Sequence, residues 1–63
     1  MHNKRLKIAR IKKSMTQLGL AEMVGVKEYD VTRWETGRAT PERRIQEQIA
    51  SILEVKRWEV FDS

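Results

Sequence analysis

Turn signals at three places cut this chain of 63 residues into short segments. Ser14 to Thr16 interrupts the first apolar pattern, and Gly25 and Gly37 end the next two, because glycine accepts the left-handed conformation of a helix C-terminus. Within the segments, apolar residues recur at helical spacing, and none alternates with period two for long enough to form a strand. The sequence therefore predicts an all-α fold, a compact bundle of about five short helices.

The first two helices are expected over residues 3–13 and between Thr16 and Gly25. Leu6 and Ala9, with Ile8 and Ile11 as further candidates, would form the apolar stripe of the first helix. Thr16 is a favourable N-cap for the second helix. Its expected inward residues share one helix face and are Leu20, Ala21 and Val24.

Three more helices are expected in the rest of the chain. The third begins one or two residues after Gly25 and places Val31, Trp34 and Glu35 on one face. The fourth is predicted to begin with Thr40 as N-cap and Pro41 at the first helical position. Its apolar positions are Ile45, Ile49, Ile52 and Leu53. Lys56 to Phe61 would form a short fifth helix.

Length and composition bound what such a chain can do. We expect a single domain over residues 1–63, small enough to bury only roughly 60% of the surface of its unfolded chain. The sequence has no cysteine, which excludes a disulfide framework, and with a single histidine a metal cage or histidine-based catalysis has almost no raw material. We expect no catalytic site, no metal and no cofactor. Without a transmembrane span or an apolar signal sequence, the expected location is the cytoplasm.

The net charge of +4 is unevenly distributed. Residues 1–13 carry six bases and no acid, whereas the other fifty residues carry seven bases and nine acids. A basic end on a nearly neutral body is typical of a protein with a polyanionic partner, which can be nucleic acid, an acidic protein or an anionic membrane. A solvated helix face explains the same charges.

The stretch from Thr16 to Pro41 carries the most information. Two helices joined by a tight turn at Gly25 and Val26 form the unit that places its second helix in the major groove of DNA. Ala21 is small where these two helices would cross, and Val31 and Trp34 would anchor the second of them to the core. This motif occupies about residues 16–37.

The spacing within this stretch resembles the Cro/repressor-type helix-turn-helix family, also called the XRE family. The matching residues are Thr16-Gln17, Leu20-Ala21, Gly25-Val26, Val31-Thr32, Trp34-Glu35, Gly37 and Pro41. The resemblance implies a lambda-repressor-like fold and a transcriptional regulator, more often a repressor, that binds a near-palindromic operator as a homodimer. It also implies a bacterial or phage origin. The chain departs from the family pattern at Ser14 and Glu54, where glycine is usual, and at Lys27, where the family has serine or threonine.

The third helix is expected to read the bases. The resemblance places base-reading residues in its first turns, and its face opposite Val31 and Trp34 would meet the major groove. The candidates are Lys27, Glu28, Tyr29, Thr32 and Arg33. Arg33 has the shape to donate to guanine O6 and N7, and Glu28 to accept from cytosine N4. A surface ion pair of Arg33 and packing of Tyr29 over the second helix are the structural alternatives.

The remaining site residues have supporting roles. The expected phosphate contacts are Gln17, Thr36, Arg38, Arg43 and Arg10. The resemblance further implies a partly buried ion pair between Arg10 and Glu35. Trp58 and Phe61 are candidates for a dimer contact, with one expected in the core and the other partly exposed.

Double-stranded DNA is therefore the leading partner, and we expect a homodimer to bind it. We expect no membrane partner. A different class of function stays open, because Glu28 and Asp30 at the start of the third helix oppose the field of the phosphates. The same fold can serve as a protein-interaction or antitoxin-type module in which DNA binding is secondary or lost.

Overall fold

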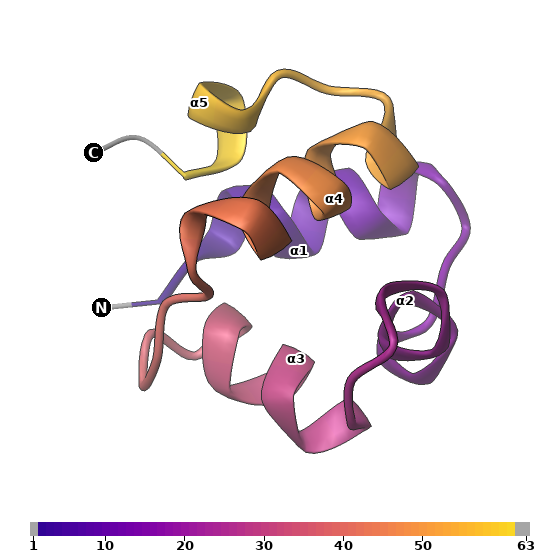
Figure 1. The fold of residues 1–63 in the computed structure, drawn as a ribbon. Helices are drawn as coiled ribbons and strands as arrows, with labels where there is room; N and C mark the ends of the chain where they lie inside the picture. The colour runs from indigo at the N-terminus through magenta and orange to yellow at the C-terminus, as the bar shows by residue number, and fades with distance from the viewer. Residues whose placement is uncertain (1, 62–63) are drawn as a thin grey trace.

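Five helices in the described residues, 2–61, surround one core in the computed structural model (Figure 1). They are α1 (Lys4–Lys12), α2 (Gln17–Val24), α3 (Glu28–Glu35), α4 (Arg43–Leu53) and α5 (Arg57–Val60). In Figure 1, α4 passes in front of α1, α5 closes the top, and α3 lies along the bottom edge beside α2. The expected all-α class is confirmed. None of these helices has both the length and the apolar character that a bilayer crossing demands.

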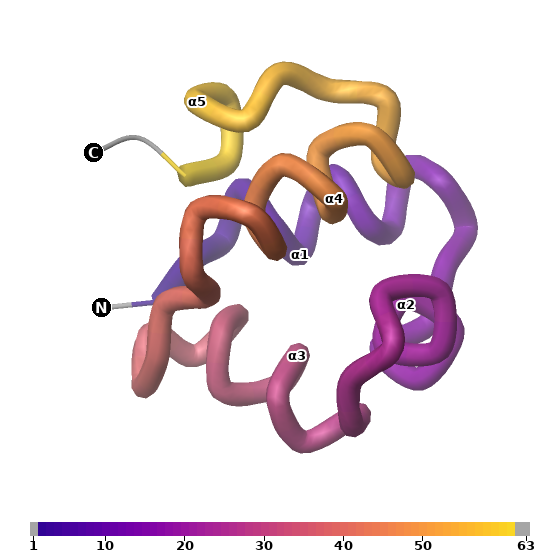
Figure 2. The backbone as a smooth tube through the Cα atoms, in the orientation of Figure 1, coloured from indigo at the N-terminus to yellow at the C-terminus, as the bar shows by residue number. Residues whose placement is uncertain are grey.

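The start of α1 and the ends of α3 and α5 are held together by Asn3. Its Oδ1 caps α1 by accepting the N–H of Leu6 at 3.0 Å. Its backbone N–H donates to the carbonyl of Glu35 at 2.9 Å, and its Nδ2 donates to the carbonyl of Val60 at 3.2 Å. The tube in Figure 2 shows the resulting return of the chain to the side on which it began.

The inward face of α1 differs from the expected stripe. Leu6 is fully buried and Ala9 packs partly against the core, but Ile8 and Ile11 are more than half exposed. The residue that shares the buried face of Leu6, one helical turn on, is Arg10. Including Ile8 and Ile11 in the stripe was therefore wrong, because neighbouring helices cover only a narrow strip of α1.

Helix α2 begins and ends as the sequence predicts. Thr16 Oγ1 accepts the N–H of Gly19 at 2.9 Å, and Gly25 ends the helix with a φ of +89°. A Cβ at position 19 would lie 3.2 Å from Thr16 Oγ1, so glycine at this position avoids a close contact with the capping hydroxyl group. The predicted inward residues Leu20, Ala21 and Val24 are all buried.

The beginning of α4 was predicted too early. Glu42, not Thr40, is the N-cap, and the first helical residue is Arg43 instead of Pro41. Pro41 is buried, and its carbonyl accepts a hydrogen bond from Gln46 Nε2 at 2.8 Å. Pro41 therefore attaches the loop to α4 through this hydrogen bond, and the helix begins only after it, at Arg43.

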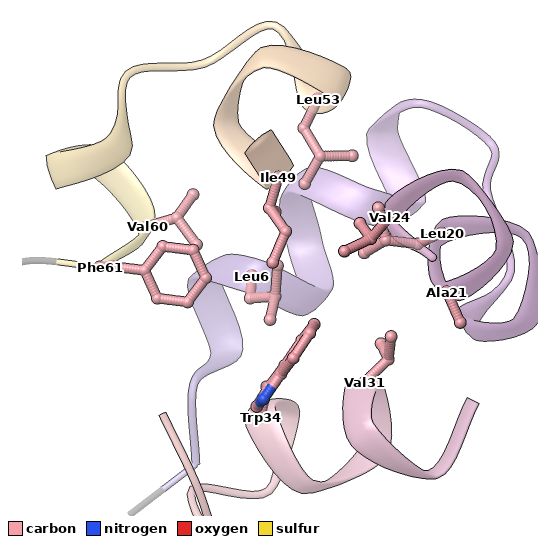
Figure 3. Packing of buried hydrophobic residues seen from close by; sticks show 10 residues of the cluster. All are labelled: Leu6, Leu20, Ala21, Val24, Val31, Trp34, Ile49, Leu53, Val60 and Phe61. Atoms are coloured by element: carbon pink, nitrogen blue, oxygen red, sulfur yellow. The ribbon is translucent and has the colours of Figure 1, made fainter. Parts of the chain in front are cut away.

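Ten apolar residues from all five helices and their ends form the core (Figure 3). They are Leu6, Leu20, Ala21, Val24, Val31, Trp34, Ile49, Leu53, Val60 and Phe61. The indole of Trp34 rises from α3 into the core below Leu6 (Figure 3). Phe61 is 6% exposed and Trp58 is 59% exposed, which matches the expected division between the two aromatic residues.

Two non-glycine residues adopt the left-handed conformation where the family usually has glycine. The φ angles of Ser14 and Glu54 are +57° and +58°. Glu54 also pairs with Lys13 at 2.7 Å, and the Lys13 ammonium lowers the pKa of this exposed carboxyl. Ser14 is exposed, and its N–H donates to the carbonyl of Ile11 at 2.8 Å.

We expect Ser14→Gly to raise the free energy of unfolding by about 0.5 kcal/mol. Relief of the left-handed strain exceeds the extra entropy that glycine gives the unfolded chain. Urea unfolding of this variant and of Ser14→Ala, which keeps the strain, measures the difference. A glycine variant no more stable than the alanine variant would contradict the strain at Ser14.

Candidate nucleic-acid interface

A tight turn fixes α3 against α2. The N–H groups of Gly25 and Val26 both donate to the carbonyl of Ala21, at 2.8 and 3.0 Å. Ala21 itself is fully buried, so its small side chain lets the two helices approach. The next backbone N–H, of Lys27, donates to Asp30 Oδ2 at 3.2 Å. The start of α3 is thus supported by an acid within its first turn, in place of the serine or threonine cap of the family pattern.

One side of α3 faces the core and the other faces solvent. Val31, Trp34 and Glu35 are buried, as the sequence predicts. The structure places all five predicted base readers away from these three residues. Lys27, Glu28 and Tyr29 are exposed, and Thr32 and Arg33 are half-buried. In Figure 1, α3 runs along the edge of the molecule, with no other helix on its outer side.

Tyr29 and Arg33 form a stacked pair on the outer face. The Cζ atom of Arg33 lies 5.5 Å from the centroid of the Tyr29 ring, one helical turn away. Tyr29 is 67% exposed, so packing over α2 does not account for its position. The described residues include no carboxylate in an ion pair with Arg33.

A buried ion pair lies behind α3. Arg10 Nε and Nη2 donate to the two carboxylate oxygens of Glu35 at 2.6 and 3.2 Å, and Arg10 Nη1 donates to the carbonyl of Met15 at 2.7 Å. The two side chains are 9% and 4% exposed. Every guanidinium nitrogen of Arg10 is therefore engaged inside the protein. This burial favours the structural role of Arg10 over its second expected role, the phosphate contact.

Gln17 connects this ion pair to the outer face. Its Nε2 donates to Glu35 Oε1 at 2.9 Å, and its Oε1 accepts from the Thr32 hydroxyl at 2.8 Å. Gln17 is also the first residue of α2, where the leading backbone N–H groups have no acceptor within the helix. The side chain predicted to bind phosphate thus also sets the position of Thr32.

The other predicted phosphate ligands lie at the end of α3 and the start of α4. The Thr36 hydroxyl donates to the carbonyl of Thr32 at 2.9 Å. Arg38 is exposed just beyond α3. Arg43 pairs with Glu47 at 3.3 Å on the exposed side of α4. Of the two candidates for a dimer contact, Phe61 belongs to the core and only Trp58 is available at the surface.

Sequence reasoning missed the support of the loop that follows α3. Gln46 is 7% exposed; its Nε2 donates to the Pro41 carbonyl, and its Oε1 accepts from Arg57 Nη1 at 2.9 Å. A glutamine among the polar residues of an amphipathic helix gives no signal of burial. Asn3 was detectable, because an asparagine directly before a helical pattern is a typical N-cap.

We expect Arg10→Met and Glu35→Leu to lower the free energy of unfolding by about 3–5 kcal/mol each, because each leaves one buried charge without its main partner. The double variant should lose far less than the sum. Urea unfolding with the same stabilising osmolyte added to every chain measures the coupling. The exposed pair of Arg43 and Glu47 serves as the matched control, with an expected coupling of about 0.3–0.5 kcal/mol. Additive losses at Arg10 and Glu35 would contradict a buried coupled pair.

Comparison with known proteins assigns the fold to a family. The model of the helix-turn-helix family matches residues 6–59, which is most of the chain. No curated protein is similar enough to the chain to count as a match. The matched region contains α2, the turn at Gly25 and α3 with its outer face, together with the Arg10–Glu35 pair. The chain therefore belongs to the helix-turn-helix family of the Cro/repressor (XRE) type, a family of DNA-binding regulators.

Proposed function

We propose that this protein is a sequence-specific repressor that inserts α3 into the major groove of a near-palindromic operator. The observation that carries the proposal is the outer face of α3. Its side chains project from a helix whose inner face is fixed by Trp34 and the Arg10–Glu35 pair. A rigid helix with an uncommitted polar face is what direct reading of base edges requires.

Four of the five predicted readers have a direct chemical role in this proposal. Arg33 donates to guanine O6 and N7, and Glu28 accepts from cytosine N4. Thr32 contacts a thymine methyl group or a phosphate, with its hydroxyl oriented by Gln17. Lys27 lies at the exposed start of α3 and contacts phosphate or a base edge.

Phosphate contacts would flank the reading helix on both sides. Gln17 and the first N–H groups of α2 bind one phosphate, and Thr36, Arg38 and Arg43 bind the backbone beyond the other end of α3. The six bases of residues 1–13 lie on or beside α1 and not on α3. We assign to them long-range attraction of the DNA, apart from Arg10.

Selection of bound sequences from a random DNA pool tests the proposal, and Arg33 provides its sharpest variants. Arg33→Ala should lose about 1–3 kcal/mol on the preferred site and relax specificity at one base position. Arg33→Lys keeps the charge but loses the planar fork. It should therefore relax specificity similarly while keeping the salt dependence of the wild type.

Two results would contradict this assignment. An equal loss on all sequences would make Arg33 a phosphate contact. An affinity for DNA that hardly changes with salt, instead of a slope near −0.9 for each phosphate contacted, would favour a protein-interaction module of the same fold.

Dimerisation on the operator rests on Trp58. This side chain is 59% exposed on α5, and a large exposed aromatic residue is a typical anchor of an interface. A two-fold contact there would present two reading helices about one DNA turn apart, roughly 34 Å.

Trp58→Ala should therefore weaken binding to the full operator, by about 2 kcal/mol if this residue is an interface anchor. Binding to an isolated half-site should not change, because Trp58 lies outside the core and on α5, not on the reading helix. Titration of both DNA fragments, with sedimentation analysis of the complexes, separates the two effects. An equal loss on half-site and full site would argue against a dimer contact at Trp58.

A further inference from the structure

We propose that Tyr29 is a positioning residue that holds the guanidinium of Arg33 ready for base recognition through the face of its ring. The inference rests on the proposed function, since it concerns the same reading helix. Its basis is the stack itself, with Arg33 Cζ 5.5 Å from the ring centroid of Tyr29. This distance lies within the range of cation–π attraction.

Arg33 has few other restraints. It lies in the last turn of α3, and no ion pair fixes it within the described residues. Of the acids nearest to it in α3, Glu35 is buried in the pair with Arg10, and the carboxylate of Asp30 accepts the N–H of Lys27 at 3.2 Å. Within the described residues, the ring of Tyr29 is therefore the one polar or aromatic partner that the structure gives to the guanidinium of Arg33.

Restraint before binding matters because a bidentate contact needs the planar guanidinium in the plane of the guanine. A free arginine side chain loses rotamer entropy when it adopts that orientation, and a stacked one has already lost part of it. Closure of the DNA over the pair also removes water, which strengthens cation–π attraction. The stack should thus favour guanine at the position that Arg33 reads.

The ring, and not the hydroxyl group, performs this role. Tyr29→Phe keeps the aromatic face and should behave as the wild type. Tyr29→Leu keeps an apolar side chain of similar reach but removes the face. Because Tyr29 is 67% exposed and outside the core, neither substitution should disturb the fold.

The stack is tested first without DNA. The side-chain methylene protons of Arg33 should show an upfield ring-current shift in the NMR spectrum of the wild type and of Tyr29→Phe. The shift should vanish in Tyr29→Leu. Ordinary random-coil shifts in the wild type would overturn the proposal at this stage.

The function of the stack is tested with the DNA site selected by the full chain. The guanine whose recognition Arg33→Ala abolishes is replaced by 7-deazaguanine, which lacks the N7 acceptor. Tyr29→Leu should reduce the preference for guanine over 7-deazaguanine by about two- to fivefold. Tyr29→Phe should keep the full preference, and Tyr29→Leu should add no further loss of preference to Arg33→Ala.

The outcomes distinguish a failure of the proposed function from a failure of the positioning role of Tyr29. A wild-type chain without sequence preference overturns the proposed function and the positioning role together. A preference that survives in Tyr29→Leu overturns only the positioning role. A loss in Tyr29→Phe equal to that in Tyr29→Leu assigns the effect to the hydroxyl group and also overturns it.

Discussion

The buried pair of Arg10 and Glu35 joins the parts of this small protein that must not move relative to one another. Two charges taken out of water are stable only when their hydrogen bonds are nearly complete, and here Met15 and Gln17 supply the bonds that the pair itself leaves over. Since the partners come from α1, α2 and α3, satisfying them requires a single arrangement of these helices. The orientation of α3 relative to α1 and α2 therefore depends on this polar junction as well as on apolar packing.

This polar junction holds the inner side of α3 and leaves its outer side open to solvent. Glu35 and Trp34 fix the helix from within, and Gln17 extends the polar contacts to Thr32 at the boundary with the outer face. The net charge of +4 contributes little to that face, because the excess of bases lies in residues 1–13. In the proposed function, attraction of a polyanion and recognition of a sequence therefore belong to different parts of the chain.

The sequence predicted the helices and the inner face of α3 because those features follow local rules. Caps such as Thr16 and turns such as Gly25 act through their own backbone, so they are visible without knowledge of neighbours. The predictions failed where neighbours decide. Ile8 and Ile11 fit a helical stripe but lie outside the strip that other helices cover, and Pro41 is used as a buried anchor of the loop before α4.

By itself, the sequence determined the all-α class, the helix-turn-helix motif and the set of residues on the outer face of α3, because spacing along a helix fixes which side chains share a face. Only the tertiary structure decided that Gln46 is interior and how the pair of Arg10 and Glu35, which the family resemblance implies, completes its hydrogen bonds. The position of Gln46 in its helix resembles that of a surface residue, yet Gln46, like Arg10, is buried with its hydrogen bonds formed. Burial of a polar group depends on partners distant in the sequence, such as Glu35 for Arg10 and Arg57 for Gln46, and only the folded chain brings these together.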